Sequence, residues 1–246
     1  MDYILTIDIG NTRSKFAIFD GKNIVNSGLF NPLGDDLSRL LYKYPTIKRG
    51  ILSSVGGKVD YCLAQLKSID TIILTSETPL PFKVQPEARG QIGADRLALV
   101  AAAFELNPHK NNLIIDAGTC ITYDILTQDD KQFCGPISPG MKLRFRTMHE
   151  HTSLLPLLDP SNAALKLLCD NTVECLQSGV IQGVVGEIKE FITAFSNIYN
   201  DLNVFISGGD NIFLENKLKN CIFANSNFLF NGLRYILEYN EIQQLK

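Results

Sequence analysis

One pattern occurs twice in this sequence, once in each half, and it constrains the fold more than any other feature. The first copy, "LTIDIGNTRSKFAIF", covers residues 5–19, and the second, "LIIDAGTCITYDIL", covers residues 113–126. Each copy has an apolar strand, then an aspartate, a glycine and a threonine, then a second strand-like segment. One copy in each half predicts two domains that share a fold. We place these domains at residues 1–108 and 109–246, with the boundary inside the polar stretch "NPHKNN".

The remaining segments predict an α/β class in which each domain has a mixed sheet with flanking helices. In the first half, apolar or alternating runs predict strands at 3–9, 14–20, 23–30, 48–55 and 71–75, and helical spacing predicts helices at 35–44, 59–67 and 95–106. In the second half, strands are expected within 112–126 and 202–209, and helices at 171–195 and 231–243. The proline-rich "PISPG" at 136–140 predicts a loop.

Composition excludes several classes of protein. The 246 residues carry a net charge of −3 without a Lys/Arg-rich run, so we expect no nucleic-acid partner. No apolar stretch is long enough to cross a bilayer, and the first residues lack a secretory signal pattern, so we expect a cytoplasmic protein without membrane contact. The six cysteines form no CxxC pair, which predicts reduced thiols packed as small apolar side chains.

The first copy of the repeat has the chemistry of a phosphate-binding turn. Gly10 allows a tight or positive-φ turn, so that backbone N–H groups can approach an anion closely. Asn11 and Thr12 add side-chain donors, and Lys15 adds a positive charge. Asp8, at the end of the strand, is suited to hold Mg²⁺ or its water molecules. Taken alone, so short a motif is more typical of a β-hairpin whose polar tip is solvated.

The second copy and a third glycine turn change this interpretation. The stretch "ISGG" at 206–209 follows an apolar strand and is suited to the base and ribose end of a nucleotide. Three such turns in this order resemble the actin/Hsp70/sugar-kinase superfamily, whose two ribonuclease-H-like domains hold ATP in a cleft between them. The resemblance implies that the hairpin tip beside Asp8 holds phosphates.

A narrower resemblance covers essentially the whole chain. Its motifs are "DIGNTRSK" (8–15), "GADR" (93–96), "DAGTCITYD" (116–124), "GPISPG" (135–140), "TSLLP" (152–156), "NT" (171–172), "SG" (178–179) and "SGG" (207–209). In this order and at this spacing they resemble the type III pantothenate kinases. The resemblance implies ATP-dependent phosphorylation of pantothenate to 4′-phosphopantothenate, the first step of coenzyme A biosynthesis. It also implies Mg²⁺ with ATP, K⁺ or NH₄⁺ as a monovalent cation, and a homodimer.

Asp95 is the expected catalytic base. It stands at the N-terminus of an apolar helix, where the helix dipole and the neighbouring Arg96 favour its charged form. An ionised carboxylate beside a bound alcohol can orient the hydroxyl and accept its proton. From the residues alone, a helix acid paired locally with Arg96 is the more ordinary interpretation, and the resemblance is what implies catalysis.

The resemblance implies the other site residues as well. ATP and its phosphates bind at Asp8, Ile9, Gly10, Asn11, Thr12, Arg13, Ser14, Lys15 and Thr119. Pantothenate binds at Gly93, Ala94, Asp95, Arg96 and, across the dimer interface, Thr172. Asp116 binds the monovalent cation, and Asp8 contacts Mg²⁺ indirectly. Without the resemblance, Thr172 is equally typical of a helix N-cap.

The chain also departs from the family pattern, and the alternatives follow from that. The position where the family usually has a substrate-contacting tyrosine is Pro86 here, with Phe82 as the nearby aromatic residue. A kinase for another small hydroxylated substrate is therefore one alternative. A catalytically silent nucleotide-binding accessory protein on the same fold is the other. The whole catalytic set is present, which argues against the silent protein: Asp8, Lys15, Asp95, Arg96 and Asp116.

Overall fold

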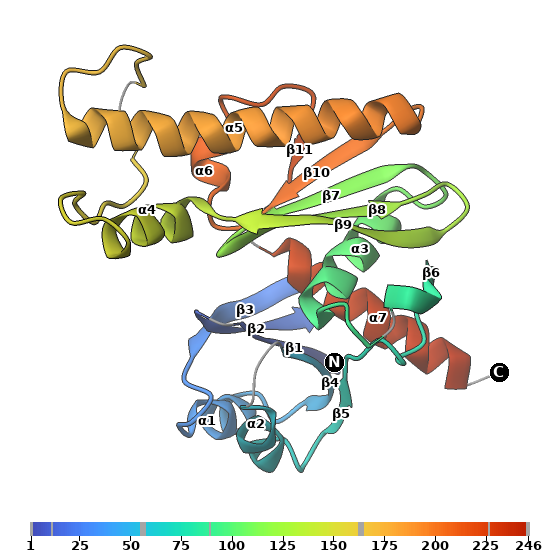
Figure 1. Ribbon diagram of the computed structural model, residues 1–246. Coiled ribbons are helices and arrows are strands. Elements are labelled where there is room, and N and C mark those ends of the chain that lie inside the picture. Colours follow the sequence, from blue (N-terminus) through green and yellow to red (C-terminus); the bar gives the residue numbers. More distant parts are fainter. Residues whose placement is uncertain are drawn as a thin grey trace. The chain divides into compact units, whose positions relative to one another are not determined.

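The computed structural model describes residues 2–10, 12–54, 58–88, 90–161, 165–225 and 227–244 (Figure 1). The chain divides into two compact units. The first comprises residues 1–109, 129–133 and 227–246, and the second comprises residues 110–128 and 134–226. The first unit thus contains a C-terminal segment that the sequence assigns to the second half.

The C-terminal helix α7 (Phe228–Gln244) belongs to the first unit because it packs along helix α3 (Ala94–Leu106). The two helices approach closely at Gly232, where a Cβ atom would lie 1.8 Å from the carbonyl oxygen of Ala98. Arg234 of α7 donates two hydrogen bonds of 2.6 Å to the carboxylate of Glu105 in α3. The periodicity of a terminal helix does not show which sheet it will cover, so the sequence could not assign it.

The first unit contains a five-stranded mixed sheet of order β3-β2-β1-β4-β5. Its strands are β1 (Tyr3–Ile9), β2 (Ser14–Asp20), β3 (Asn23–Phe30), β4 (Ile47–Ser54) and β5 (Asp70–Ile73). The hairpin strands are antiparallel, whereas β4 runs parallel to β1 and to β5. Helices α1 (Asp36–Lys43) and α2 (Val59–Gln65) complete this unit together with α3 and α7.

The two faces of this sheet are covered by different helices (Figure 1). Leu5, Ile7 and Ile9 of β1 share a buried apolar cluster with residues of α1 and α2. Side chains alternate along a strand, so Asp8 points to the opposite face. That face is the one covered by α3 and α7, as the Arg234 guanidinium over the ring of Phe19 shows. The fold thereby puts Asp8 on the same side of the sheet as α3.

The second unit contains the strands β7 (Asn112–Ala117), β8 (Cys120–Leu126), β10 (Asn203–Ser207) and β11 (Ile222–Phe223). It also contains β9 (Lys131–Pro139) from Cys134 onward. Its helices are α4 (Met141–Glu150), α5 (Thr172–Ile198) and the short α6 (Asn211–Leu214). Leu113, Ile115 and Ala117 of β7 are buried in one cluster with apolar residues of α4 and α5. By the same alternation, Asp116 points to the other face of this sheet.

The two sheets have the same topology, which confirms the repeat predicted from the sequence. Apart from the two-residue edge strand β6 (Lys83–Val84), which pairs with β9, the order β9-β8-β7-β10-β11 of the second sheet matches β3-β2-β1-β4-β5 in the first. In both, the strand that ends near the aspartate forms an antiparallel hairpin on one side and pairs with a parallel strand on the other. The predicted α/β fold class with two mixed sheets and flanking helices is therefore confirmed.

Two smaller predictions are wrong. The stretch 136–140 was expected as a loop, but its first four residues lie in β9. Strand β6 (Lys83–Val84) pairs with only Lys131 and Gln132 of β9, so Pro136 and Pro139 lie beyond this pairing, where a missing N–H is tolerated. The six cysteines are free, but Cys120, Cys134 and Cys175 are exposed and not packed in a core.

In the part of the chain that the structure describes, no helix is both long and apolar enough to span a bilayer.

Candidate active site

The tip of the β1–β2 hairpin forms a tight turn beside Asp8. The N–H of Gly10 donates a hydrogen bond of 3.1 Å to the carbonyl oxygen of Arg13. A Cβ atom on Gly10 would lie 3.0 Å from that same oxygen, a tighter contact than most side chains make. Glycine therefore lets the turn close without a shift of the backbone at Arg13. Thr12 and Arg13 are exposed at this turn, and Asn11 lies outside the described residues.

The carboxylate of Asp8 lies among neighbours from three elements of the first unit. Ser53 of β4 donates a hydrogen bond of 2.8 Å from Oγ to Asp8 Oδ1. Burial is the largest cause that raises the pKa of Asp8, from 3.8 to about 6. The charge of Asp95 raises this pKa further, whereas the Ser53 bond and the charge of Lys15 lower it. Lys15 lies directly opposite Asp8 in the hairpin register.

Asp95 belongs to the first turn of α3, which is preceded by Gly93 in an extended conformation. Its Oδ1 accepts a hydrogen bond of 2.9 Å from the backbone N–H of Arg96. Asp95 is half-buried, and Arg96 is 9% exposed. An acid in the first helical turn is favoured in its charged form by the helix dipole. Asp95 is near enough to Asp8 for its charge to raise the pKa of Asp8.

The turn after Asp8 and the turn after Asp116 are here called the two corners. At the second corner, glycines from three segments lie close together. The N–H of Gly118 donates to the carbonyl oxygen of Cys120 at 3.0 Å, and the N–H of Gly140 donates to that of Thr119 at 3.0 Å. A Cβ atom on Gly140 would lie 2.0 Å from the carbonyl oxygen of Gly118. Gly208 has a φ of +104°, and its Cβ would lie 2.2 Å from the carbonyl oxygen of Ala117. Where the segments of Gly140 and Gly208 meet the turn after β7, there is therefore no room for a Cβ atom on either glycine.

The structure sorts the predicted nucleotide-binding residues into two groups. Asp8, Gly10 and Lys15 lie together in the first unit, and Asp116 and Thr119 lie on one turn in the second. The side chain of Ile9 is buried on the face of α1 and α2, so only its backbone can belong to the site. Ser14 is also buried, at 8% exposure.

The predicted substrate residues lie at two helix starts. Gly93, Ala94, Asp95 and Arg96 form the start of α3, and Ala94 is buried. Thr172 is the first residue of α5 and is exposed. The N-cap of α5 is Asn171, whose side chain accepts a hydrogen bond of 3.0 Å from the N–H of Glu174. The alternative that Thr172 itself serves as the N-cap is therefore wrong.

Two residues beside the corners were missed by sequence reasoning. Ser53 contacts Asp8, and its only signal is its place at the end of a strand, in "LSS". Asp210 is 6% exposed, and its Oδ2 accepts a hydrogen bond of 3.3 Å from the N–H of Met141 at the start of α4. Burial raises the pKa of Asp210. It follows the "SGG" turn directly, and that position could have suggested it.

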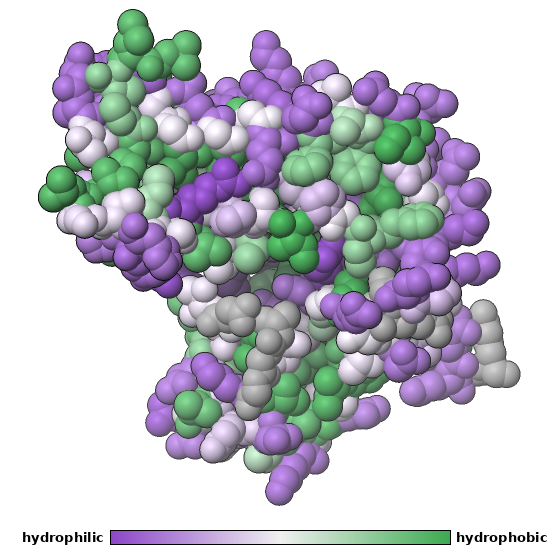
Figure 2. Space-filling model, viewed as in Figure 1, coloured by the Kyte–Doolittle hydropathy of each residue, from purple (hydrophilic) through white to green (hydrophobic). Residues whose placement is uncertain are grey.

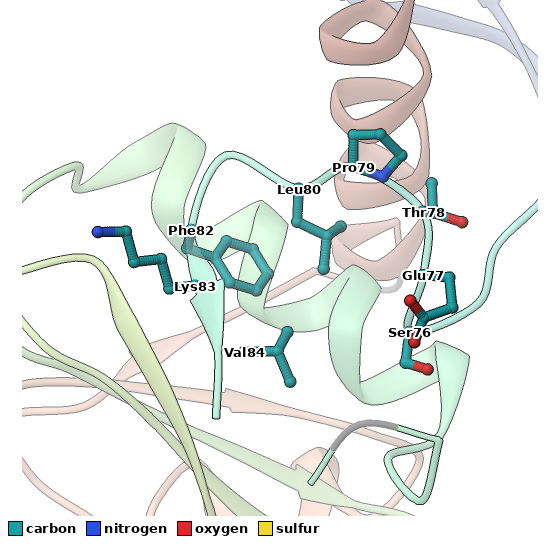
Figure 3. Close-up of a pocket in the computed structure, with 8 residues that line it drawn as sticks. All are labelled: Ser76, Glu77, Thr78, Pro79, Leu80, Phe82, Lys83 and Val84. Atoms are coloured by element: carbon teal, nitrogen blue, oxygen red, sulfur yellow. The ribbon is translucent and has the colours of Figure 1, made fainter. Parts of the chain in front are cut away.

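The segment between β5 and α3 closes around a pocket of about 260 Å³ in the first unit (Figure 3). The pocket is lined by Ser76, Glu77, Thr78, Pro79, Leu80, Phe82, Lys83 and Val84. Phe82 is 5% exposed, and its ring centroid lies 6.3 Å from that of Phe104 in α3. Phe82 therefore packs into the first unit against α3.

The donor set around Asp8 fits a divalent ion that is bound mainly through phosphate. Mg²⁺ usually takes one or two protein carboxylates and completes its shell with water and phosphate oxygens. Among the described residues, no three His, Cys, Asp or Glu side chains are grouped so as to hold a metal by themselves. Asp8 Oδ2 would lie 3.7 Å from a Cβ on Gly10, so this oxygen is on the side of the turn.

Solved structures with the same fold define the class of protein. A protein from Campylobacter jejuni described as belonging to the Baf family of transcriptional activators has a TM-score of 0.63 at 22% identity, over 97% of this chain and 99% of that one. The activator of 2-hydroxyisocaproyl-CoA dehydratase from Clostridium difficile, with bound ADPNP, has a TM-score of 0.57 at 14% identity, over 99% and 97%. A glucokinase from an Antarctic psychrotroph has a TM-score of 0.52 at 15% identity, over 97% and 99%. The chain has the actin/Hsp70/sugar-kinase type of ATPase fold.

Sequence relatives define the family within that class. The sequence profile of type III pantothenate kinase matches residues 4–194. The type III pantothenate kinase of Christiangramia forsetii is 43% identical over 97% of this chain and 99% of its own length. That of Flavobacterium johnsoniae is 38% identical over 96% and 98%. The chain belongs to the type III pantothenate kinase family.

Proposed function

We propose that this protein transfers the γ-phosphate of ATP to pantothenate and forms 4′-phosphopantothenate, the first step of coenzyme A biosynthesis. The observation that carries the proposal is the placement of Asp8, Lys15 and Asp95 on one face of the first sheet, beside a turn of exposed polar residues. The family match supports pantothenate as the acceptor. A carboxylate for the metal, a cation and a second carboxylate for the hydroxyl are what phosphoryl transfer needs.

In this proposal the turn around Gly10 binds the phosphates. Backbone N–H groups and the side chains of Thr12, Arg13 and Lys15 are donors that can contact phosphate oxygens, and all three side chains are exposed. Asn11 is assigned to the same group from the family resemblance. When bound with ATP, Mg²⁺ would neutralise part of the charge on the phosphates, and Asp8 would hold it through its water molecules.

Asp95 acts as the base that orients and deprotonates the pantothenate hydroxyl. Its Oδ1 is held by the N–H of Arg96, which fixes the carboxylate on the first turn of α3. The guanidinium of Arg96 is suited to bind the pantothenate carboxylate, because such pairs form charge-assisted hydrogen bonds. Gly93 and Ala94 contribute backbone to the same proposed pantothenate-binding site.

Asp116 is assigned to the monovalent cation, K⁺ or NH₄⁺, and Thr119 to a contact with ATP. The support is the turn after β7, where a Cβ atom on Gly118 would lie 3.8 Å from Asp116 Oδ2 and 3.8 Å from the carbonyl oxygen of Cys120. A large, weakly charged ion can be held by one carboxylate together with carbonyl oxygens.

A cytoplasmic homodimer is the proposed assembly, with Thr172 of one subunit reaching the pantothenate of the other. The exposed apolar residues of the second unit support an interface near Thr172. Leu154, Leu167 and Leu168 are 91%, 90% and 88% exposed, and all lie in the segment between α4 and α5. Figure 2 shows hydrophobic surface at the end of the second unit where α4 lies and α5 begins. Exposed apolar surface of this kind marks interaction sites.

The decisive experiment is a coupled assay of ADP release with pantothenate as acceptor, run with MgCl₂ in KCl or in NaCl. We expect turnover in KCl and loss of most of it in NaCl. Equal rates in the two salts would refute the cation role of Asp116. No turnover with pantothenate, but turnover with another small alcohol, would move the assignment to the alternative suggested by Pro86.

The role of Asp95 is tested separately. Asp95→Asn keeps the shape of the side chain but cannot accept a proton, so we expect kcat to fall by about 10²- to 10⁴-fold while ATP still binds. A variant with near-normal kcat would show that another group handles the hydroxyl.

A further inference from the structure

Ser53 donates a side-chain hydrogen bond to the carboxylate of Asp8, beside the turn that is proposed to bind phosphates. It lies near the end of β4, directly opposite Asp8 in the parallel register of β1 and β4, and is 0% exposed. Its Oγ donates to Asp8 Oδ1 at 2.8 Å and lies 3.4 Å from the carbonyl oxygen of Ile7. A buried hydroxyl that bonds a carboxylate restricts the rotation of both groups.

The bond fixes which oxygen of Asp8 faces the turn. With Oδ1 bound to Ser53, Oδ2 lies on the side of Gly10, where a Cβ atom would be 3.7 Å away. Oδ2 is thus directed to the place where phosphates and a divalent ion would lie. The absence of a side chain at Gly10 keeps this approach open.

The same arrangement of positions recurs in the second unit. Asp116 Oδ2 would lie 3.8 Å from a Cβ on Gly118, again the glycine two residues after the aspartate. Ser207 of β10 stands opposite Asp116 in the parallel register, as Ser53 stands opposite Asp8. Aspartate, glycine and serine thus occupy equivalent positions in both units. This repetition indicates that the serine is a structural part of the turn beside the aspartate.

We propose that Ser53 is a positioning residue that holds the carboxylate of Asp8 in the orientation needed for the divalent ion of the ATP complex. The inference rests on the proposed function, because it concerns the same corner. Ser53 itself touches neither substrate nor metal; it acts through Asp8. Removing a hydrogen-bond partner of a metal-binding carboxylate commonly weakens metal affinity by about 10- to 100-fold.

The test compares Ser53→Ala with Thr6→Val in the full-length protein. Thr6 is a suitable control because its buried hydroxyl donates to the carbonyl oxygen of Ala17, on the neighbouring strand, and not to Asp8. Both variants lose one buried hydroxyl from the same sheet. The readout is the affinity for Mn²⁺ in the presence of a non-hydrolysable ATP analogue, measured by electron paramagnetic resonance. This affinity reports on metal binding beside Asp8 and does not require turnover.

We expect Ser53→Ala to bind Mn²⁺ about 10-fold or more weakly, with a matching rise in the Mg²⁺ concentration for half-maximal rate and an unchanged KM for pantothenate. Thr6→Val should match the wild type in all three. Equal Mn²⁺ binding by Ser53→Ala and wild type, or equal weakening in both variants, would overturn the proposal. If Ser53→Ala does not fold, Ser53→Cys replaces it, because a thiol is a weak donor of similar size; undiminished binding would then overturn the proposal.

The two proposals fail in different ways. A wild-type protein that binds Mn²⁺ with the analogue but does not phosphorylate pantothenate would refute the proposed function. The comparison of Ser53→Ala with wild type would still decide the role of Ser53, because it depends on metal binding alone.

Discussion

The buried carboxylate of Asp8 makes the metal-free protein less stable at neutral pH than it would be with a neutral side chain. Its pKa is raised from 3.8 to about 6, mainly by burial. Between these two pH values the folded state binds the proton more tightly than the unfolded state, so the free energy of unfolding falls as the pH rises. A rise of about 2 units at about 1.4 kcal/mol per unit gives roughly 3 kcal/mol, which is lost in full above pH 6.

Asp8→Asn removes this charge and keeps an oxygen that can accept the bond from Ser53. We expect the variant to be more stable than the wild type at pH 7.5 by up to about 3 kcal/mol, and the advantage to vanish below pH 4. The same variant should lose most kinase activity. A residue that lowers stability while it serves the reaction is typical of an active site.

The measurement is urea unfolding followed by far-ultraviolet circular dichroism, in EDTA, at several pH values between 4 and 8. Asp60→Asn is the control, because it removes an exposed carboxylate from α2 in the same unit. Adding Mg²⁺ with an ATP analogue should reduce the advantage of Asp8→Asn, since the ligand stabilises only the wild-type corner. A wild type that is the more stable protein at pH 7.5 in EDTA, or a difference that does not change with pH, would refute the reasoning.

Two further substitutions test the packing of each unit. Gly208→Ala should destabilise the second unit by at least about 2 kcal/mol in thermal or urea unfolding, because φ is +104° and the new Cβ would lie 2.2 Å from the carbonyl oxygen of Ala117. Gly209→Ala, whose Cβ would meet nothing within 4 Å, should have little effect, and equal losses in the two would contradict this. Arg234→Met should destabilise the first unit by about 1.5–3 kcal/mol, because Glu105 loses its buried cationic partner and is left with the exposed Lys22. A loss below about 1 kcal/mol would show that the ion pair is not needed.

Local patterns in the sequence were sufficient for the parts of the fold that depend on neighbouring residues. The hairpin strands, the starts of α3 and α5 and the repeat around Asp8 and Asp116 follow from alternation, helical spacing and turn residues. The role of Asn171 as N-cap was open to the same logic, since asparagine is a stronger capping residue than threonine.

Features that depend on distant segments could not be predicted in this way. The contact of Ser53 with Asp8 joins residues 45 positions apart and requires the register of two parallel strands. The placement of α7 depends on the close approach at Gly232, and β9 continues through Pro136 because β6 pairs with only its first two residues. Each is set by tertiary structure, which overrides the local preference of proline or of a terminal helix.

The two corners differ at one hairpin position, and this difference bears on the two ions that we propose for them. Aspartate, glycine and serine occupy equivalent positions in both. Opposite the aspartate in the hairpin, however, the first unit has Lys15, and the second has the neutral Thr122. A corner with a lysine favours the negative charge of a triphosphate with its divalent ion. A carboxylate with no lysine opposite it in the hairpin favours a single weakly charged cation, so the difference at this position supports the proposed assignment of phosphates to Asp8 and of K⁺ to Asp116.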